Sequence, residues 1–119
     1  MTDQVGQAVY IRAQANGEYK VARCDPTNPS KMPAIGIILN KWLAGGSYHC
    51  LVQIWGEVRG LFSGLLPRRM YSVAVDGRPK FPCDGPDPGG TFLHQNLGVA
   101  LDVGVLLLNP SNDLTRRVG

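Results

Sequence analysis

The chain is poor in charged residues and has no window that suits a long helix. Charged residues make up 18% of its 119 residues, against about 25% in typical soluble domains. This composition argues against a disordered chain, which needs a high net charge and few apolar residues. The longest stretch without glycine or proline runs from residue 7 to residue 16, and these two residue types are the least favourable in helices. Helical bundles, coiled coils, βαβ nucleotide-binding folds and transmembrane helices are therefore excluded.

Cysteine and histidine are too scarce and too scattered to form a covalent or metal-bound framework. Cys24, Cys50 and Cys83 are an odd number of widely spaced cysteines, which does not make a disulfide pattern. There is no C-x-x-C, and neither histidine stands at zinc-like spacing from a cysteine. The sequence therefore predicts thiols in a reducing compartment, no bound metal and no cofactor.

Signals for export and for nucleic-acid binding are also missing. Residues 1–4 contain neither a basic segment nor an apolar one, so we expect no signal peptide and synthesis in a cytoplasm. The formal net charge is +3, and the only adjacent basic pairs are Arg68-Arg69 and Arg116-Arg117. A nucleic-acid-binding face is more densely basic and interleaved with aromatic residues, so the composition does not favour nucleic acid as a partner.

What the chain has instead is short apolar alternation between turns. Fifteen glycines and nine prolines make up about a fifth of the residues, against about 12% in average proteins. Residues 7–13 and 18–24 alternate on either side of Asn16-Gly17, which is a hairpin turn signal. We expect a loop or hairpin turn at Gly45-Gly46, a bend at Gly56 and proline-rich loops at 25–33 and 79–90. Between them, further strands are expected over residues 34–40, 48–55, 57–62, 70–75, 91–101 and 103–108.

These patterns predict an all-β fold, a single small β-sandwich or barrel of seven to nine short strands with long Pro/Gly-rich loops. We expect one domain over residues 1–119, with a core over about 6–110, a flexible N-terminal arm at 1–5 and a C-terminal tail at 111–119. A chain of this size buries about two thirds of the surface that its unfolded form exposes. The inward positions of the strands give the expected core: Val9, Ile11, Val21, Ile37, Leu39, Val52, Ile54, Val73, Val99, Leu101, Leu106 and Leu108.

Two candidate reactive sites are each better explained as structure. Cys50 or Cys83 beside a histidine would make a nucleophile, but Cys50 occupies an inward strand position, where cysteine usually packs as a small hydrophobe. Cys83 lies in the proline-rich loop, where we expect it to be exposed. Asp84, Asp87 and Asp102 could gather a hard cation, yet Asp-Gly and Asp-Pro are ordinary turn dipeptides. The sequence therefore predicts a protein that is not an enzyme.

The remaining candidates point to an interface. Trp42 falls in the expected loop after residue 40, and an exposed tryptophan is costly unless it contacts a partner or covers its own core. We expect an apolar centre at Trp42 or in the proline-rich loop, with arginines at the rim. The candidate interface residues are Trp42, Arg68, Arg69, Phe81, Arg116 and Arg117.

A series of short motifs runs through residues 6–110 in a characteristic order. A G-x-x-V segment opens at Gly6, a G-x-V-x-G strand follows at Gly56, and Leu66-Pro67 precedes the strand that begins near Tyr71. An Asp-Gly turn follows at 76–77, and G-x-A occurs at 98–100. This order resembles the small β domain found in structural proteins of tailed bacteriophages, which occurs in head decoration (cement) proteins, head fibres and tail fibres. The chain departs from that pattern where Arg68-Arg69 replaces a glycine that is usual after the proline, and where Ser72 replaces an aromatic residue.

The resemblance implies a virion structural protein on the capsid surface, made in the host cytoplasm. It implies a head decoration protein that binds the major capsid protein, bridges neighbouring coat subunits and stabilises the lattice. It also implies a homo-oligomer, with a trimer favoured, and no membrane partner. The alternative is a tail or fibre-associated module with a receptor- or glycan-binding surface at Trp42 and Tyr48. Decoration is favoured over it because a fibre subunit normally carries an additional stalk or anchoring segment, for which we expect no room in 119 residues. A small β-barrel enzyme or nucleic-acid binder is the third and least favoured alternative.

Overall fold

The computed structural model describes residues 4–74, 76–80, 91–111 and 115–118. Their elements are antiparallel β-strands and one short 3-10 turn, η1 (Pro29–Lys31), so the predicted all-β class is confirmed. The molecule measures 41 × 32 × 22 Å along its principal axes. Within the described ranges, no helix has the length and apolar character needed to cross a bilayer.

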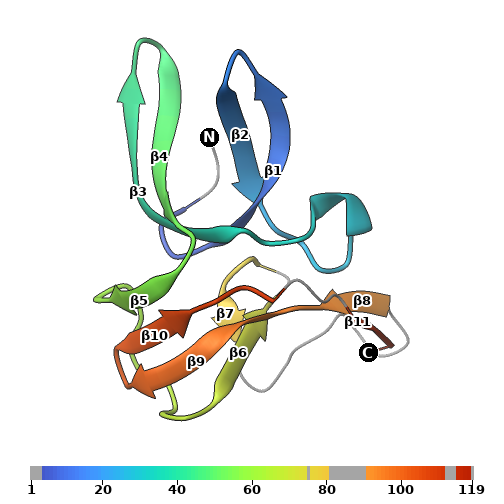
Figure 1. Ribbon diagram of the computed structural model, residues 1–119, viewed down its shortest axis with the longest axis vertical. Helices are drawn as coiled ribbons and strands as arrows, with labels where there is room; N and C mark the ends of the chain where they lie inside the picture. The colour runs from blue at the N-terminus through green and yellow to red at the C-terminus, as the bar shows by residue number, and fades with distance from the viewer. Residues whose placement is uncertain (1–3, 75, 81–90, 112–114, 119) are drawn as a thin grey trace.

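A four-stranded sheet is built from two hairpins that meet only at their bases. Its order is β2-β1-β3-β4, from β1 (Ala8–Ala15), β2 (Glu18–Arg23), β3 (Gly36–Ala44) and β4 (Ser47–Gln53). The register between β1 and β3 covers only Ala8 with Ile37 and Val9 with Gly36. Beyond this joint the hairpins separate and rise as two arms (Figure 1). We call the β1–β2 hairpin the first arm and the β3–β4 hairpin the second arm.

Both arms close through two-residue turns of the same kind. Asn16 and Gly17 have φ of 53° and 76°, and Gly45 and Gly46 have φ of 59° and 80°. Positive φ at both central residues is the mark of a type I′ turn, whose twist matches that of the flanking strands. The predicted turn at Asn16-Gly17 is therefore confirmed. The expected loop after residue 40 shrinks to Gly45-Gly46, which places Trp42 inside β3 and not in a loop.

A five-stranded sheet lies below the arms (Figure 1). Its order is β5-β10-β9-β6-β7, from β5 (Gly56–Arg59), β10 (Val105–Leu108), β9 (Asn96–Asp102), β6 (Met70–Val73) and β7 (Pro79–Lys80). The chain passes from β4 directly into β5, so the second arm is continuous with the edge of this sheet. The expected bend at Gly56 is confirmed, because this residue has φ of 95° at the corner between the two sheets.

Two short strands form a separate pair, one in an expected strand and one in the expected C-terminal tail. β8 (Thr91–His94) pairs with β11 (Thr115–Val118), so the expected C-terminal tail contains a strand. Gln95 divides the expected strand 91–101 into β8 and β9. β7 falls in the expected proline-rich loop. The described residues therefore contain eleven strands, more than the seven to nine that were expected. Residues 81–90 of that loop lie outside the described residues.

The end of the expected N-terminal arm is held against the body. The guanidinium of Arg78 donates to the Gln4 side-chain oxygen (3.1 Å) and to the Val5 carbonyl (3.4 Å). The Gln4 amide donates to the side-chain oxygen of Gln7 (2.7 Å). Residues 1–3 lie outside the described residues.

The core lies where the arm bases pack on the five-stranded sheet. Side chains from both sheets form one buried cluster, which includes Ala8, Cys24, Ile37, Val58, Tyr71, Val73, Leu97, Ala100, Leu106 and Leu108. This contact between two sheets is the sandwich that the alternation predicted. Of the expected core residues, those fully buried are Val9, Ile37, Val73, Leu106 and Leu108, and those half-buried are Val21, Leu39, Val52 and Val99.

The predicted burial of Ile11, Ile54 and Leu101 is wrong, since all three side chains are exposed. Ile11 lies on the first arm above the joint, where no second layer covers the hairpin. Ile54 lies at the corner between β4 and β5, outside both strands. Leu101 is the extra residue of a register shift, because Ala100 pairs with Leu106 and Asp102 pairs with Val105. Alternation identifies one face of a strand, but it does not show whether another layer covers that face.

Candidate functional site

The tip of the second arm carries the densest group of exposed apolar side chains on either arm. Trp42 is 45% exposed, Leu43 61%, Tyr48 51% and Leu51 54%. The Trp42 ring stacks on the ring of His49, with centroids 6.0 Å apart and an angle of 18° between the planes. Soluble proteins seldom leave such groups uncovered unless the patch binds something. We therefore take this tip as a candidate interface.

The apolar side chains of the second-arm tip lie on both faces of the ribbon. Trp42 pairs across the strands with His49, and Leu43 pairs with Tyr48. Cross-strand partners share a face and successive residues alternate, so Leu51 joins Trp42 and His49. Leu43 and Tyr48 point to the opposite side. A flat partner would therefore cover only half of the apolar surface.

The same segment has no formal charge. Residues 42–56 contain no aspartate, glutamate, lysine or arginine, and residues 26–56 contain no carboxylate. Centres of protein–protein interfaces are depleted in charge and enriched in aromatic residues. The composition of the tip is that of an interface centre.

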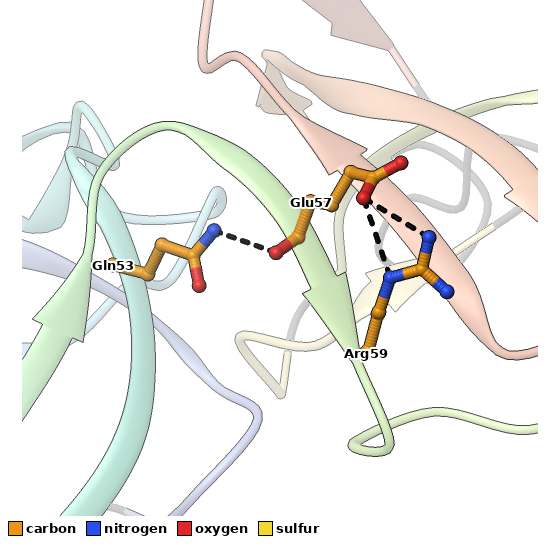
Figure 2. Close-up of polar contacts among 3 residues, drawn as sticks. All are labelled: Gln53, Glu57 and Arg59. Carbon is orange, nitrogen blue, oxygen red and sulfur yellow. Dashed lines mark hydrogen bonds and ion pairs between the residues drawn. The ribbon is translucent and has the colours of Figure 1, made fainter.

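A second apolar feature is the corner between β4 and β5, where Ile54 is 62% exposed and Trp55 73%. The Gln53 amide nitrogen donates to the carbonyls of Trp55 and Glu57, each at 2.9 Å. Figure 2 shows the second of these bonds, together with the Arg59 guanidinium on the Glu57 carboxylate at 3.0 Å. The Gln53 side chain therefore bridges the two sides of the corner, and two large apolar side chains are exposed there.

The arginines expected at the interface rim do not gather around Trp42. Arg68 and Arg69 are exposed in the segment between β5 and β6, which lies at the end of the molecule opposite the arm tips (Figure 1). Arg68 has φ of 68°, a conformation that glycine favours, and its amide donates to the Ala100 carbonyl at 2.7 Å. Arg116 and Arg117 lie in β11, paired with β8. Phe81 lies outside the described residues.

The cysteines do not form a reaction centre in the described part of the chain. Cys24 is fully buried, and burial, followed by the Asp25 carboxylate, raises the pKa of its thiol from 9.0 to about 12. Because the thiolate is the nucleophile, this thiol is inert at neutral pH. Cys50 is half-buried in β4. Cys83 lies outside the described residues.

The acidic residues do not form a cation site among the described residues either, where no three His, Cys, Asp or Glu side chains come together. Asp102 accepts a hydrogen bond from the Val103 amide at 2.7 Å, which is the turn role expected from its sequence context. Asp84 and Asp87 lie outside the described residues.

The buried polar side chains act as clamps. The amide group of Gln95 accepts from the Ala34 amide (2.8 Å) and donates to the carbonyls of Ala34 (3.0 Å) and Ser111 (2.9 Å). The Gln7 side chain donates to the Asp76 carbonyl at 2.9 Å. Over the described ranges every buried side-chain nitrogen and oxygen has a hydrogen-bond partner. None of these groups is therefore left over to bind a ligand.

A shallow hollow over the five-stranded sheet also lacks reactive groups. No ionisable side chain lines it; its walls are Met70, Asn96, Gly98, Val99, Leu107, Asn109, Pro110 and Ser111. The chemistry available in this hollow is therefore apolar contact and hydrogen bonding to amide and hydroxyl groups.

Sequence reasoning found Trp42 and Tyr48 but did not single out Leu43, Leu51 and Trp55 as interface candidates, although none of them stood at an expected core position. The signal that would have found them is the lack of any charge over 42–56 next to a Gly-Gly turn, which marks a hairpin tip with nothing to keep it solvated. No protein-family model, curated protein or solved structure matches this chain.

Proposed function

We propose that this chain is a virion structural protein of a tailed bacteriophage, a head decoration (cement) protein that binds the major capsid protein and stabilises the capsid lattice. The observation that carries the proposal is the uncharged corner at Ile54 and Trp55, whose two large apolar side chains are exposed and whose backbone is bridged by the Gln53 side chain. The motif order over residues 6–110 supports the same function.

The corner suits a mechanical role. Interfaces draw most of their binding energy from a few large side chains that enter a partner's pocket, and tryptophan is among the commonest of these. The backbone that carries Trp55 needs little further ordering when it binds, because the Gln53 side chain already bridges the two sides of the corner. A protein that holds coat subunits together needs such a preordered apolar anchor more than it needs a flexible charged one.

Apolar contact also suits a protein that must remain bound as ionic conditions change. Charged groups at an interface rim act mainly on the association rate, and salt screens them. Arg68 and Arg69, which are exposed, belong to this weaker class. Lattice binding through the corner is therefore insensitive to salt.

The test is the fraction of protein retained on purified phage heads at low and high salt. We expect Trp55→Ala to weaken retention by at least about tenfold at both salt concentrations, as for an interface hot spot. The control, Arg68→Ala with Arg69→Ala, should change retention by less than about fivefold, as for exposed charges. Full retention of the Trp55 variant, or loss of the wild type in high salt, would contradict the proposal.

A tail or fibre-associated module with a glycan-binding surface is the second candidate function. It is favoured by one observation, the exposed Trp42 ring stacked on His49, although Tyr48 lies on the opposite face of the same arm. The location and copy number of the protein on the particle separate the two candidates. Many copies spread over the head support decoration, whereas a few copies at the tail support the second candidate.

A further inference from the structure

The two main sheets end in the edge strands β2, β4, β5 and β7. On one side an edge strand has backbone N–H and C=O groups that can pair with another chain, and proteins usually protect such edges with charged side chains or proline. Three of these edges are protected in this way. β2 carries Glu18, Lys20 and Arg23, β5 carries Glu57 and Arg59, and β7 consists of Pro79 and Lys80.

The exception is β4, whose residues Ser47–Gln53 include no charged residue and no proline. The register shift between β3 and β4 lies in β3, because Ile38 and Asn40 pair with the consecutive residues Val52 and Leu51. β4 therefore has no bulge that would turn its edge away from an incoming strand. In the described part of the chain it pairs only with β3.

The hydrogen bonds of Ile38 show which backbone groups of β4 point outward. The Ile38 amide donates to the Gln7 carbonyl at 3.1 Å, and the Ile38 carbonyl accepts from the Gly6 amide at 2.8 Å. Ile38 therefore directs its backbone groups away from Val52, its cross-strand partner in β4. Because hydrogen-bonded and non-hydrogen-bonded pairs alternate along an antiparallel ladder, the backbone groups of Val52 and of Tyr48, four residues earlier, point to the outer edge.

The two faces of β4 carry different side chains. The face with Tyr48 and Val52 also carries Lys41 of β3, which lies opposite Cys50. The other face carries Leu51, whose side chain is exposed. An incoming strand with carboxylates on the first face and apolar side chains on the second would therefore meet a cation on one side and apolar surface on the other.

The charge distribution favours a segment of another protein over a second copy of this chain. Residues 8–53, which include the four-stranded sheet, contain five lysine or arginine residues and two carboxylates. By the same count, β4 and β5 are neutral, and β2 and β7 are each net positive. None of these edges in a second copy would bring negative charge to β4, whereas a segment rich in carboxylates would.

We infer that the outer edge of β4 binds an extended, net-acidic segment of another protein, which adds a strand to the four-stranded sheet. In strand addition of this kind, backbone hydrogen bonds supply the affinity and side chains at alternate positions supply the specificity. This edge is separate from the corner at Ile54 and Trp55, and the inference does not depend on the proposed function.

The experiment measures binding of a labelled, end-blocked peptide, Val-Glu-Val-Thr-Val-Glu-Val-Thr, by fluorescence anisotropy. Tyr48→Pro removes an outward N–H and leaves the hydrogen bonds between β4 and β3, as edge strands allow. The matched control is Tyr19→Pro in β2, since both tyrosines belong to the cross-strand pair one step from a type I′ turn. We expect Tyr48→Pro to bind at least about fivefold more weakly than the wild type, and Tyr19→Pro to bind as the wild type does.

A second peptide, with lysine in place of both glutamates, tests the charge of the segment. It should bind more weakly than the first at low salt, and high salt should reduce the difference. Equal binding of the two peptides at low salt would overturn the assignment of an acidic segment.

Failure of the wild type to bind the first peptide, or an equal loss in the two proline variants, overturns the inference. If Tyr48→Pro does not fold, hydrogen exchange of the wild type decides: the peptide should protect the amides of Tyr48 and Val52 but not those of residues 18–23. An equal response in both strands contradicts strand addition at β4.

Two further outcomes separate this inference from its alternatives. Protection of the Tyr48 and Val52 amides that rises with protein concentration, without peptide, would assign the edge to a second copy and overturn the choice of occupant. Trp55→Ala should bind the peptide as the wild type does. A protein that binds the peptide but not phage heads refutes only the proposed function.

Discussion

The two hairpins of the four-stranded sheet have the same turn geometry and the same pairing at their tips, but different exposed side chains. The first arm ends in Gln14, Glu18 and Lys20, and the second in Leu43, Ser47 and His49. The shared features are those that build a hairpin, namely two residues at positive φ between alternating strands. The differing features are side chains exposed at the tips, including the Trp42 ring that stacks on His49. The comparison shows that the local fold and the binding surface are specified by different residues of one motif.

At their bases the two arms differ in sequence, but the residues of both are buried in the same core. Ala8 and Val9 of β1 and Ile37 and Ile38 of β3 are all fully buried. The core therefore ends where the arms separate. Substitutions at the buried bases of the arms should therefore lower the free energy of unfolding far more than substitutions at the exposed tips.

The largest expected effect is at the base of the second arm. Ile37→Ala should lower the free energy of unfolding by about 2–5 kcal/mol, because the side chain is fully buried and leaves a cavity. Leu43→Ala at the tip should change it by less than about 0.5 kcal/mol in the monomer. Urea denaturation at a concentration where the chain is monomeric measures both. Similar losses at the two positions would show that the tip packs against the body.

The next effect is at the joint between the arms. Gly36 pairs with Val9, and a Cβ at this position would overlap the Gln53 carbonyl oxygen of β4. Gly36→Ala should therefore cost about 1–3 kcal/mol by overpacking. The same denaturation assay measures this loss. A neutral result would mean that the two strands of the second arm can move apart at no cost.

A pH dependence is expected from the base of the first arm. The folded chain keeps the Cys24 proton up to about pH 12, whereas the thiol ordinarily loses it near 9.0. Between these values the folded state binds more protons than the unfolded state, so stability falls as pH rises, by up to about 1.4 kcal/mol per pH unit. Below pH 9 both states hold the proton and this group contributes no slope.

The check on this slope is Cys24→Ala, measured from pH 8 to pH 11 by urea denaturation. The variant loses stability at every pH, but its slope above pH 9 should be shallower than that of the wild type. Equal slopes would show that the thiol does not couple to unfolding.

The smallest expected effect is at the turn of the second arm. Gly45→Asn copies the Asn-Gly turn of the first arm, where Asn16 has nearly the same φ as Gly45. Replacing glycine reduces the entropy of the unfolded chain at a position that asparagine tolerates. We expect a gain of about 0.5 kcal/mol or less, measured as a small rise in Tm. A clear fall in Tm would mean that the two turns differ in conformation even though their φ values are similar.

Part of the candidate site could be predicted from residues close together in the sequence. Trp42 and Tyr48 were identified because exposed aromatic residues near a Gly-Gly pair have few roles other than binding. Ile54 was misassigned to the core because its alternation with Val52 is the same whether or not a second layer covers it. Trp55 was missed because its exposure depends on the corner that Gln53 closes. Arg68 and Trp42 were grouped by residue type, and the fold places them at opposite ends of the molecule.

Residues close together in the chain are enough to predict the all-β class, the hairpin at Asn16-Gly17 and the bend at Gly56, since glycine, proline and alternation act over a few residues. Which apolar faces are covered follows from how the two sheets pack together. Leu106 and Ile54 have similar hydropathy and were both expected in the core, yet one is fully buried and the other mostly exposed. Burial is a property of contacts between segments far apart in the chain. The uncovered faces, which carry the proposed interfaces, therefore became visible only when both sheets were in place.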